Sequence, residues 1–415
     1  MSQELTRRAA LTGLAGGAAA ATLAPVRRAR AADAPVLRLG VLTDLSGPYA
    51  DVSGSGSVIC AQQAAAEAMA AHPGMKVEIV SGDHQNKPDV GASIAREWFD
   101  RGGVDAILDV PNSGVGLAVA SVCREKDKVF LVTGAATDQL TGSKCSPNTV
   151  HWTFDTYMLA RVTGGALVEQ GLKNWFFLVA DYVFGHVLEK DATALIDAAH
   201  GKVVGSVAYP FPGTADFSSY LVQAQSSGAQ VLGLGNAGHD TVNCIKQAHE
   251  FGLNKTMTIA AMLMFITSVH SLGLETAQGL VLSESFYWDL NDRTRAFSDR
   301  MLKRRANWRP NMEQAGTYAA TIHYCKVAAA MGVAAAKQSG AKTVVQMKVM
   351  PTDDDAFGKG YIRADGRKIQ PAYLFRVKKP SESKGEWDLY NVVATIPPDQ
   401  ASRPVAEGHC SIVHA

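Results

Sequence analysis

Short runs of β-branched and apolar residues alternate with Ala-rich segments of helical length, and this alternation restricts the possible fold more than any other feature of the sequence. It predicts a parallel sheet covered by helices, because parallel neighbouring strands need a crossover that a helix supplies. We expect the first strands over residues 36–43, 76–81, 106–110 and 129–132, and the helices between them over 58–71, 88–101 and 114–126.

The alternation restarts at residue 156, which predicts a second sheet of the same kind. A helix is expected over 156–170, and strands over 175–180, 203–209, 231–234 and 257–261. The last third departs from this rhythm. There we expect a strand in "GLVLSESFYW", long helices over 293–306 and 313–336, and a closing hairpin of 371–377 with 387–396.

Two lobes follow from this pattern, since a chain of 415 residues exceeds what one core usually holds. The long helices suit a return to the first sheet and the hairpin a return to the second. We therefore assign residues 33–155 plus 285–360 to an N-terminal lobe and 156–284 plus 361–415 to a C-terminal lobe. The predicted fold class is α/β, with two doubly wound parallel-sheet lobes joined by a multi-crossing hinge beside a cleft.

Residues 1–32 have a different composition. Arg7 and Arg8 precede a weakly apolar Gly/Ala-rich run, which is too short for a membrane span and is followed by small-residue cleavage sites. This pattern resembles a twin-arginine export signal. We expect a mature protein that begins near Asp33 and is soluble in the periplasm, without insertion into the membrane.

Charge and cysteine content exclude several functions. The 40 Lys and Arg nearly balance the 39 Asp and Glu, so no net field favours nucleic acid. The six cysteines form no C-x-x-C pair, and no metal site is expected. An oxidising compartment permits disulfides, for which Cys145 and Cys410 in their loops are the best candidates, although the sequence leaves the pairing open.

Signatures of nucleotide binding and catalysis are missing. The loop "GVLTDLSGPYADVSGSG" at residues 40–56 lacks the Lys of a phosphate-binding loop and the register of a dinucleotide fingerprint. His84, His239 and His270 are scattered and belong to no catalytic or metal-ligand motif, which favours structural or solvated roles. We expect no cofactor and no enzyme activity. A secreted hydrolase stays open as an alternative that would need a base and a nucleophile meeting in the cleft.

Small polar residues follow two successive predicted strands. Asn112 and Ser113 come after one strand, at the start of a helix, and Ala135, Ala136 and Thr137 come after the next. Ligands of open α/β sheets bind beyond the carboxyl ends of the strands, where helix N-termini favour anions. Hydroxyls and free amides at two adjacent strand ends therefore predict a receptor for a carboxylate, although Ser and Thr at such places are also good helix caps.

Several blocks occur in an order that resembles a known family, namely "GVLTDLSGPYADVSGSG", "PNSGVGLAVA", "LVTGAATDQLTGS", "DYVFGHVLEKDA" and "GNAGHDTVNCIKQAHEFGL". They are similar to the periplasmic solute-binding proteins of branched-chain amino acid ABC transporters, which have the type I periplasmic binding fold. The resemblance implies that Ser113, Ala135 and Thr137 hold a carboxylate, and that Tyr182 and Phe184 cover the ligand. It also implies an inner-membrane permease as partner.

The predicted second wall departs from the amino-acid-binding members of this family. Asn236 and Met262 stand where groups that hold an ammonium are expected, which favours a carboxylate without a charged amine. Aromatic residues such as Tyr49 and Phe184 suit a planar ring. We expect a small aromatic acid such as a benzoate or hydroxycinnamate. A branched-chain amino acid, another aliphatic acid or an amide stays open, as does a periplasmic ligand sensor on the same fold.

Overall fold

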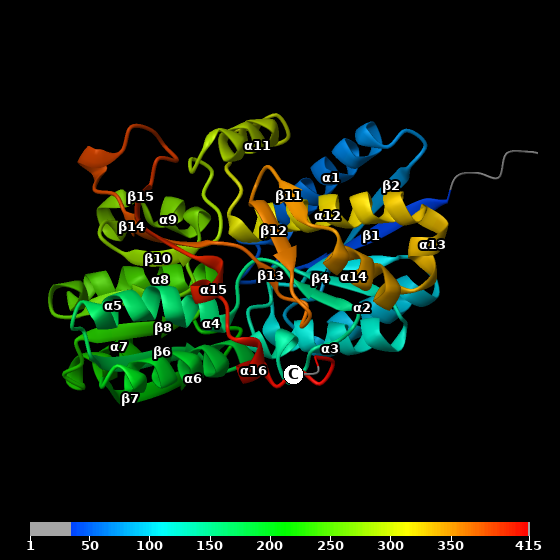
Figure 1. Cartoon of the computed structure of the whole chain (residues 1–415). Helices are drawn as coiled ribbons and strands as arrows, with labels where there is room; N and C mark the ends of the chain where they lie inside the picture. Colours follow the sequence, from blue (N-terminus) through cyan, green and yellow to red (C-terminus); the bar gives the residue numbers. More distant parts are fainter. Residues whose placement is uncertain (1–34, 414–415) are drawn as a thin grey trace, which may run out of the picture. The chain divides into compact units, whose positions relative to one another are not determined.

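Two sheets organise residues 35–413, the part of the chain that the computed structural model describes (Figure 1). The first sheet is parallel throughout and has the strand order β2-β1-β3-β4-β5. Its strands are β1 (Val36–Thr43), β2 (Lys76–Asp83), β3 (Ala106–Asp109), β4 (Val129–Val132) and β5 (Thr149–His151). The predicted export signal at residues 1–32 lies outside the described residues.

Helices cover both faces of this sheet, as the alternation predicts. The residues of β3 are all buried, and they alternate between two apolar clusters. Leu108 packs in the cluster that contains the Ala-rich faces of α1 and α12, whereas Ile107 packs with residues of α2 and α3. The covering helices are α1 (Gly54–Ala71), α2 (Pro88–Asp100), α3 (Ser113–Glu125) and α12 (Met312–Met331). The predicted return of a late helix to the first sheet is confirmed.

The second sheet has the order β15-β14-β10-β9-β8-β6-β7. Its parallel part consists of β6 (Asn174–Ala180), β7 (Lys202–Tyr209), β8 (Val231–Gly235), β9 (Thr258–Ala261) and β10 (Val281–Glu284). The hairpin of β14 (Ala372–Val377) and β15 (Tyr390–Ile396) joins β10 in antiparallel sense, which confirms the predicted return of the hairpin to this sheet. The helices of this part are α6 (Val183–Ala198), α7 (Ser218–Ser226), α8 (Gly238–Glu250), α9 (Ile266–Leu272) and α10 (Leu274–Ala277).

The parallel parts of both sheets repeat one strand order. In each, the first strand of the unit lies between the second and the third, so that β1 neighbours β3 and β6 neighbours β8. The connections leave the sheet in opposite directions at this point, and ligands of doubly wound sheets bind beside it, beyond the carboxyl ends of the strands. The topology therefore marks two places, after β1 and β3 and after β6 and β8, as the walls of a site.

Several elements differ from the sequence prediction. The helix expected over 156–170 consists of α4 (Thr156–Leu159), a π-helical turn (Ala160–Gly164) and α5 (Gly165–Glu169). The helix expected over 313–336 ends at Met331, because Gly332 has a φ of 83°, and α13 (Val333–Gln338) follows. Helix α1 begins at Gly54, four residues before the predicted start at 58.

A small sheet and several short helices were not expected. The sheet contains β11 (Thr352–Asp354), β12 (Gly358–Ile362) and β13 (Lys368–Ile369), whose polar sequences carry no apolar run. The remaining elements are η1 (Asp138–Thr141), η3 (Leu253–Lys255), α11 (Asp292–Leu302), α14 (Gly340–Val349), η4 (Pro380–Glu382), α15 (Pro398–Ala401) and α16 (Val405–Gly408). Helix α11 had been predicted, over 293–306.

A disulfide joins Cys145 to Cys410 across 265 residues of sequence. It ties the segment after α16 to the loop after η1, and it confirms that these two cysteines are the ones in a disulfide. The other four cysteines are buried and free. The assignment of residues 33–155 plus 285–360 and of 156–284 plus 361–415 to two lobes stays a prediction.

Candidate functional site

A small cavity lies where the topology predicts a site, between the carboxyl ends of the two sheets. Its first wall follows β1, β3 and β4, its second wall follows β6, β8 and β9, and one residue comes from the first turn of α12. The cavity has a volume of about 10 Å³, which is room for about one water molecule. The lining residues are Tyr49, Val52, Pro111, Gly134 and Ala136 of the first wall, Tyr182, Phe184, Ala237, Leu263 and Phe265 of the second, and Glu313.

Four of the predicted site residues line this cavity: Tyr49, Ala136, Tyr182 and Phe184. The other six are buried and do not line it, whereas five positions next to them in the sequence do. These six are Asn112, Ser113, Ala135, Thr137, Asn236 and Met262. Their part in ligand binding stays a prediction.

The polar groups of the predicted carboxylate receptor are bonded to one another. Asn112 caps α3 by accepting a hydrogen bond from the backbone N–H of Val115 at 3.1 Å. Ser113 Oγ accepts from the backbone N–H of Thr137 at 3.2 Å, and Thr137 Oγ1 accepts from the N–H of Gln139 at 3.4 Å. The first two distances lie within the ordinary range of N–H···O hydrogen bonds, and the third is longer.

The second wall is apolar apart from Asn236 and the Tyr182 hydroxyl. Asn236 Oδ1 accepts from Thr241 Oγ1 at 2.7 Å, so this amide is engaged with α8. Met262 is fully buried and packs in the core cluster that also contains Phe184 and Phe265. The wall therefore offers aromatic and aliphatic surface, and no charged side chain of the second wall lines the cavity.

The Gly-rich loop after β1 is organised around a carboxylate of the protein itself. Asp44 accepts hydrogen bonds from the backbone N–H groups of Gly47 at 2.6 Å and Tyr49 at 2.9 Å, and from Asn86 Nδ2 at 2.6 Å. A Cβ on Gly47 would lie 2.7 Å from this carboxylate, so only glycine fits without a shift. The loop thus encloses an internal anion, and it positions Tyr49 in the first wall.

Aromatic side chains join the two walls. The hydroxyls of Tyr49 and Tyr182 are 2.6 Å apart, and both rings stack on Phe211, at centroid distances of 5.4 and 4.6 Å. His239 adds a second bridge, because its Nε2 lies 2.7 Å from Asp51 Oδ2 and its backbone N–H donates to Pro48. The structure thus holds the walls together through few polar contacts.

Acidic partners for two of the three histidines come from distant parts of the chain. His239 pairs with an aspartate of the first loop, and His270 Nε2 lies 3.0 Å from Glu386. The third, His84, is buried, and its Nδ1 accepts from the backbone N–H of Asn86. All three therefore make hydrogen bonds within the fold, in line with the structural role predicted for them.

Glu313 is a candidate site residue that no sequence motif indicated. It lines the cavity from the first turn of α12 and is 1% exposed. Burial raises the pKa of its carboxyl well above the ordinary value, and the neighbouring Asp109 carboxyl adds to this effect. Burial also raises the pKa of Asp109, to about 6, while a hydrogen bond from Thr133 Oγ1 at 3.2 Å opposes the rise.

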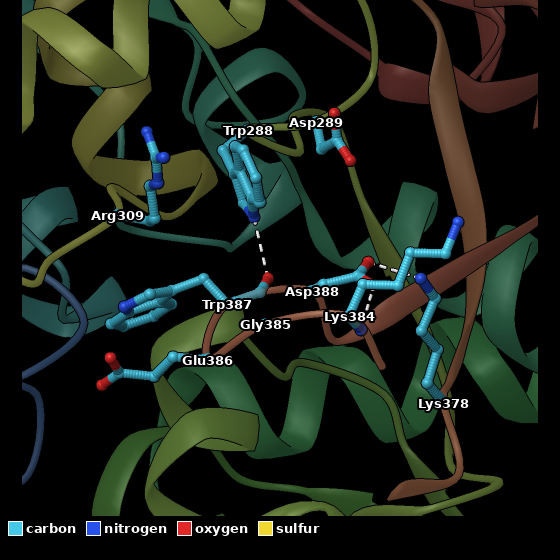
Figure 2. Close-up of a pocket in the computed structure, with 9 residues that line it drawn as sticks. All are labelled: Trp288, Asp289, Arg309, Lys378, Lys384, Gly385, Glu386, Trp387 and Asp388. Atoms are coloured by element: carbon cyan, nitrogen blue, oxygen red, sulfur yellow. Dashed lines mark hydrogen bonds and ion pairs between the residues drawn. The ribbon is translucent and has the colours of Figure 1, made fainter. Parts of the chain in front are cut away.

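Larger cavities lie outside this region. One of about 450 Å³ lies at the β14–β15 hairpin tip, where Trp288 Nε1 donates to the backbone oxygen of Trp387 and Arg309 stacks on Trp288 at 4.1 Å (Figure 2). Another of about 670 Å³ lies beside α5 and α6. In the cavity at the hairpin tip, Lys378 forms an ion pair with Asp388. Neither cavity is lined from the carboxyl ends of both sheets, and we place the site at the smaller one.

Metal-binding clusters and membrane-spanning helices are both missing from residues 35–413. No cluster of three or more His, Cys, Asp or Glu side chains is arranged to hold a metal ion there. Within the same residues, no helix has the length and apolar character needed to cross a bilayer.

Comparisons with known proteins agree with this architecture. A family model described as "Periplasmic binding protein" matches residues 36–386. A periplasmic binding protein of Burkholderia mallei is 47% identical, with a TM-score of 0.87 over 92% of this chain and 99% of that one. A branched chain amino acid ABC transporter periplasmic ligand-binding protein of Burkholderia xenovorans is 40% identical, with a TM-score of 0.79 over 91% and 99%.

More distant relatives match as well. An ABC transporter solute-binding protein of R. palustris, solved in complex with 4-hydroxybenzoate, is 22% identical, with a TM-score of 0.78 over 88% of this chain and 98% of that one, which shows a shared fold. The Leu/Ile/Val-binding protein homolog 6 of Brucella melitensis is 28% identical over 55% of this chain. The matched part spans 58% of that protein's length.

Proposed function

The chain belongs to the periplasmic binding protein family, and on that premise we propose that it is the substrate-binding component of an ABC importer. It captures a small carboxylate with an apolar, aromatic body between the two sheets and presents it to a permease of the inner membrane. The observation that carries this proposal is a cavity lined from the carboxyl ends of six parallel strands, with aromatic side chains on both walls.

The polar end of the ligand belongs at the first wall. Ser113 and Thr137 lie there with the N-terminus of α3, whose backbone N–H groups and dipole favour an anion. The hydrogen bond between the Ser113 hydroxyl and the Thr137 amide would be exchanged for bonds to the carboxylate. Because hydrogen bonds to a charged group are stronger than those between neutral groups, the exchange favours binding.

The body of the ligand belongs at the second wall. Tyr182, Phe184 and Phe265 offer ring surface there, and Leu263 adds aliphatic surface. The R. palustris relative was solved with 4-hydroxybenzoate, which supports an aromatic acid. The B. xenovorans relative, a branched chain amino acid ABC transporter periplasmic ligand-binding protein, instead supports a branched-chain amino acid, which is the second candidate.

Binding requires the walls to separate, because a cavity of about 10 Å³ admits no organic acid. Hinge closure of two lobes about a ligand is a familiar motion of such folds. The Tyr49–Tyr182 hydroxyl contact and the His239–Asp51 pair are the bonds that would break on opening and form again on closing.

Calorimetric titration of the purified protein tests the proposal. The ligands are benzoates, hydroxycinnamates, branched-chain amino acids and short dicarboxylates. Aromatic acids should bind, and Ser113→Ala and Thr137→Ala should each weaken binding by about tenfold or more, as expected for a lost hydrogen bond to a charge. Ser226→Ala on the exposed face of α7 is the control and should leave binding unchanged. No binding of any carboxylate, or conversion of a ligand to product, would contradict the proposal.

A further inference from the structure

The proposed function leaves one buried group at the cavity unused. Glu313 contributes the only charged or acidic side chain among the cavity-lining residues, and it is almost completely shielded from solvent. Oε1 of its carboxyl is fully buried and has no hydrogen-bond partner among residues 35–413. A buried polar group without a partner costs about 1–3 kcal/mol, so its retention at a cavity calls for an explanation.

The groups around Glu313 determine which hydrogen bonds its carboxyl can form with a ligand. Its neighbour is the carboxyl of Asp109, also fully buried, and each of the two carboxyls has one buried oxygen without a hydrogen-bond partner among residues 35–413. Two adjacent buried carboxylates cannot both be charged, so the pair carries at most one negative charge. Glu313 Oε1 is therefore an acceptor that needs a donor.

The position of this acceptor is next to the predicted carboxylate receptor. A Cβ on Gly134 would overlap Glu313 Oε1 and would also lie 2.7 Å from the Cα of Pro111. Gly134 directly precedes Ala135, and Pro111 directly precedes Asn112. The Glu313 carboxyl therefore lies at the ends of β3 and β4, where the carboxylate of the ligand is expected.

We propose that Glu313 accepts a hydrogen bond from an amine or hydroxyl group on the carbon next to the carboxylate of the ligand. The site then selects acids that carry such a donor over acids that lack it. This inference rests on the proposed function and makes its ligand class more specific. It also supplies, from the first wall, the ammonium partner that the second wall lacks at Asn236 and Met262.

A matched ligand series tests the inference on the unmodified protein. The ligands are 3-phenylpropanoate without a donor, L-3-phenyllactate with a hydroxyl and L-phenylalanine with an ammonium, and titration calorimetry gives each Kd. At least one donor-bearing acid should bind about 10- to 100-fold more tightly than 3-phenylpropanoate, as expected for a buried hydrogen bond to an acid group. The tighter of the two identifies the donor as hydroxyl or amine. Equal binding of all three overturns the inference and leaves the proposed function standing.

Variants of Glu313 assign the preference to this side chain. Glu313→Leu should reduce the preference to less than about threefold while 3-phenylpropanoate still binds, whereas Glu313→Gln keeps an acceptor oxygen and should retain the preference for a hydroxyl. Asp354→Asn removes another buried carboxyl, one that does not line the cavity, and should leave the preference intact. A preference that survives in Glu313→Leu overturns the inference. If no acid of the series and no other carboxylate binds the unmodified protein, the proposed function itself has failed.

Discussion

Glu284, at the end of β10, allows a stability prediction that is independent of any ligand. Its carboxyl is fully buried, and it accepts hydrogen bonds from Tyr390 Oη at 2.8 Å and from the backbone N–H of Met312 at 3.3 Å. Burial raises its pKa from the ordinary 4.5 to about 8, against the opposing effect of these two hydrogen bonds. The side chain is therefore protonated in the folded protein at neutral pH and ionised in the unfolded chain.

The sign and size of the effect follow from this difference. Because the folded state binds the proton more tightly, the contribution of Glu284 to stability is complete below pH 4.5 and is lost as the pH rises through 8. One pH unit corresponds to about 1.4 kcal/mol, so the whole difference is worth about 5 kcal/mol. Between pH 5 and pH 9, this group alone should lower the free energy of unfolding by about 4 kcal/mol.

The substitution Glu284→Gln isolates the effect, since glutamine does not titrate. Urea unfolding of both proteins at pH 5, 7 and 9 gives the difference in free energy of unfolding at each pH. The variant loses one hydrogen bond, which costs about 1 kcal/mol at every pH. Relative to the unmodified protein, it should gain about 4 kcal/mol from pH 5 to pH 9. Other buried carboxyls such as Asp109 are present in both proteins and cancel. Parallel pH dependences would refute the reasoning, because they would mean that Glu284 is solvated or already ionised in the folded state.

Three further changes have definite expected outcomes. Replacing Cys145 and Cys410 by serine opens a covalent loop of 265 residues and should lower the free energy of unfolding by about 2–5 kcal/mol, which urea unfolding with and without a reductant can verify on the unmodified protein. Tyr49→Phe removes the hydroxyl contact to Tyr182 and should weaken ligand binding by about 2- to 10-fold in calorimetry, and an unchanged Kd would mean that the contact does not favour closure. Gly47→Ala places a methyl against the carboxylate that the first loop encloses and should cost about 1–3 kcal/mol in thermal unfolding, whereas a neutral result would show that the loop can shift.

The strands of both sheets were predictable because each is a short apolar run with a distinct end. Strands β1 and β4 have the predicted bounds, and most of the others differ by one or two residues. Strand β15 begins three residues later than predicted, and β5 was not predicted. The small sheet was not predictable, since β11 reads "TDD" and β12 reads "GKGYI", and neither carries an apolar pattern. The π-helical turn at Ala160–Gly164 also has no signal in an otherwise helical sequence.

The candidate site was predictable to the extent that it depends on strand ends. Ligands of doubly wound sheets bind beyond the carboxyl ends of the strands, and this rule identifies the segments that meet there. Every residue that lines the cavity except Glu313 comes from such a segment. They do not distinguish the residue that faces the cavity from its neighbour. Asn112 and Thr137 were chosen for their polar side chains, whereas the lining is formed by Pro111 and Ala136.

The sequence of α12 contains one feature that points to Glu313. Helix α12 is buried along most of its length and on all sides, and its sequence "MEQAGTYAATIHYCKVAAAM" is mostly small and apolar. A glutamate in the first turn of a helix is ordinarily explained by the helix dipole and by solvent exposure. The first turn of α12 has no exposed face, so solvent does not stabilise the charge of Glu313. A buried acid of this kind needs a partner or a ligand. An acidic residue in the first turn of such a helix therefore predicts a buried carboxyl that needs a partner or a ligand, even when the residue it meets, here Asp109, lies far away in the sequence.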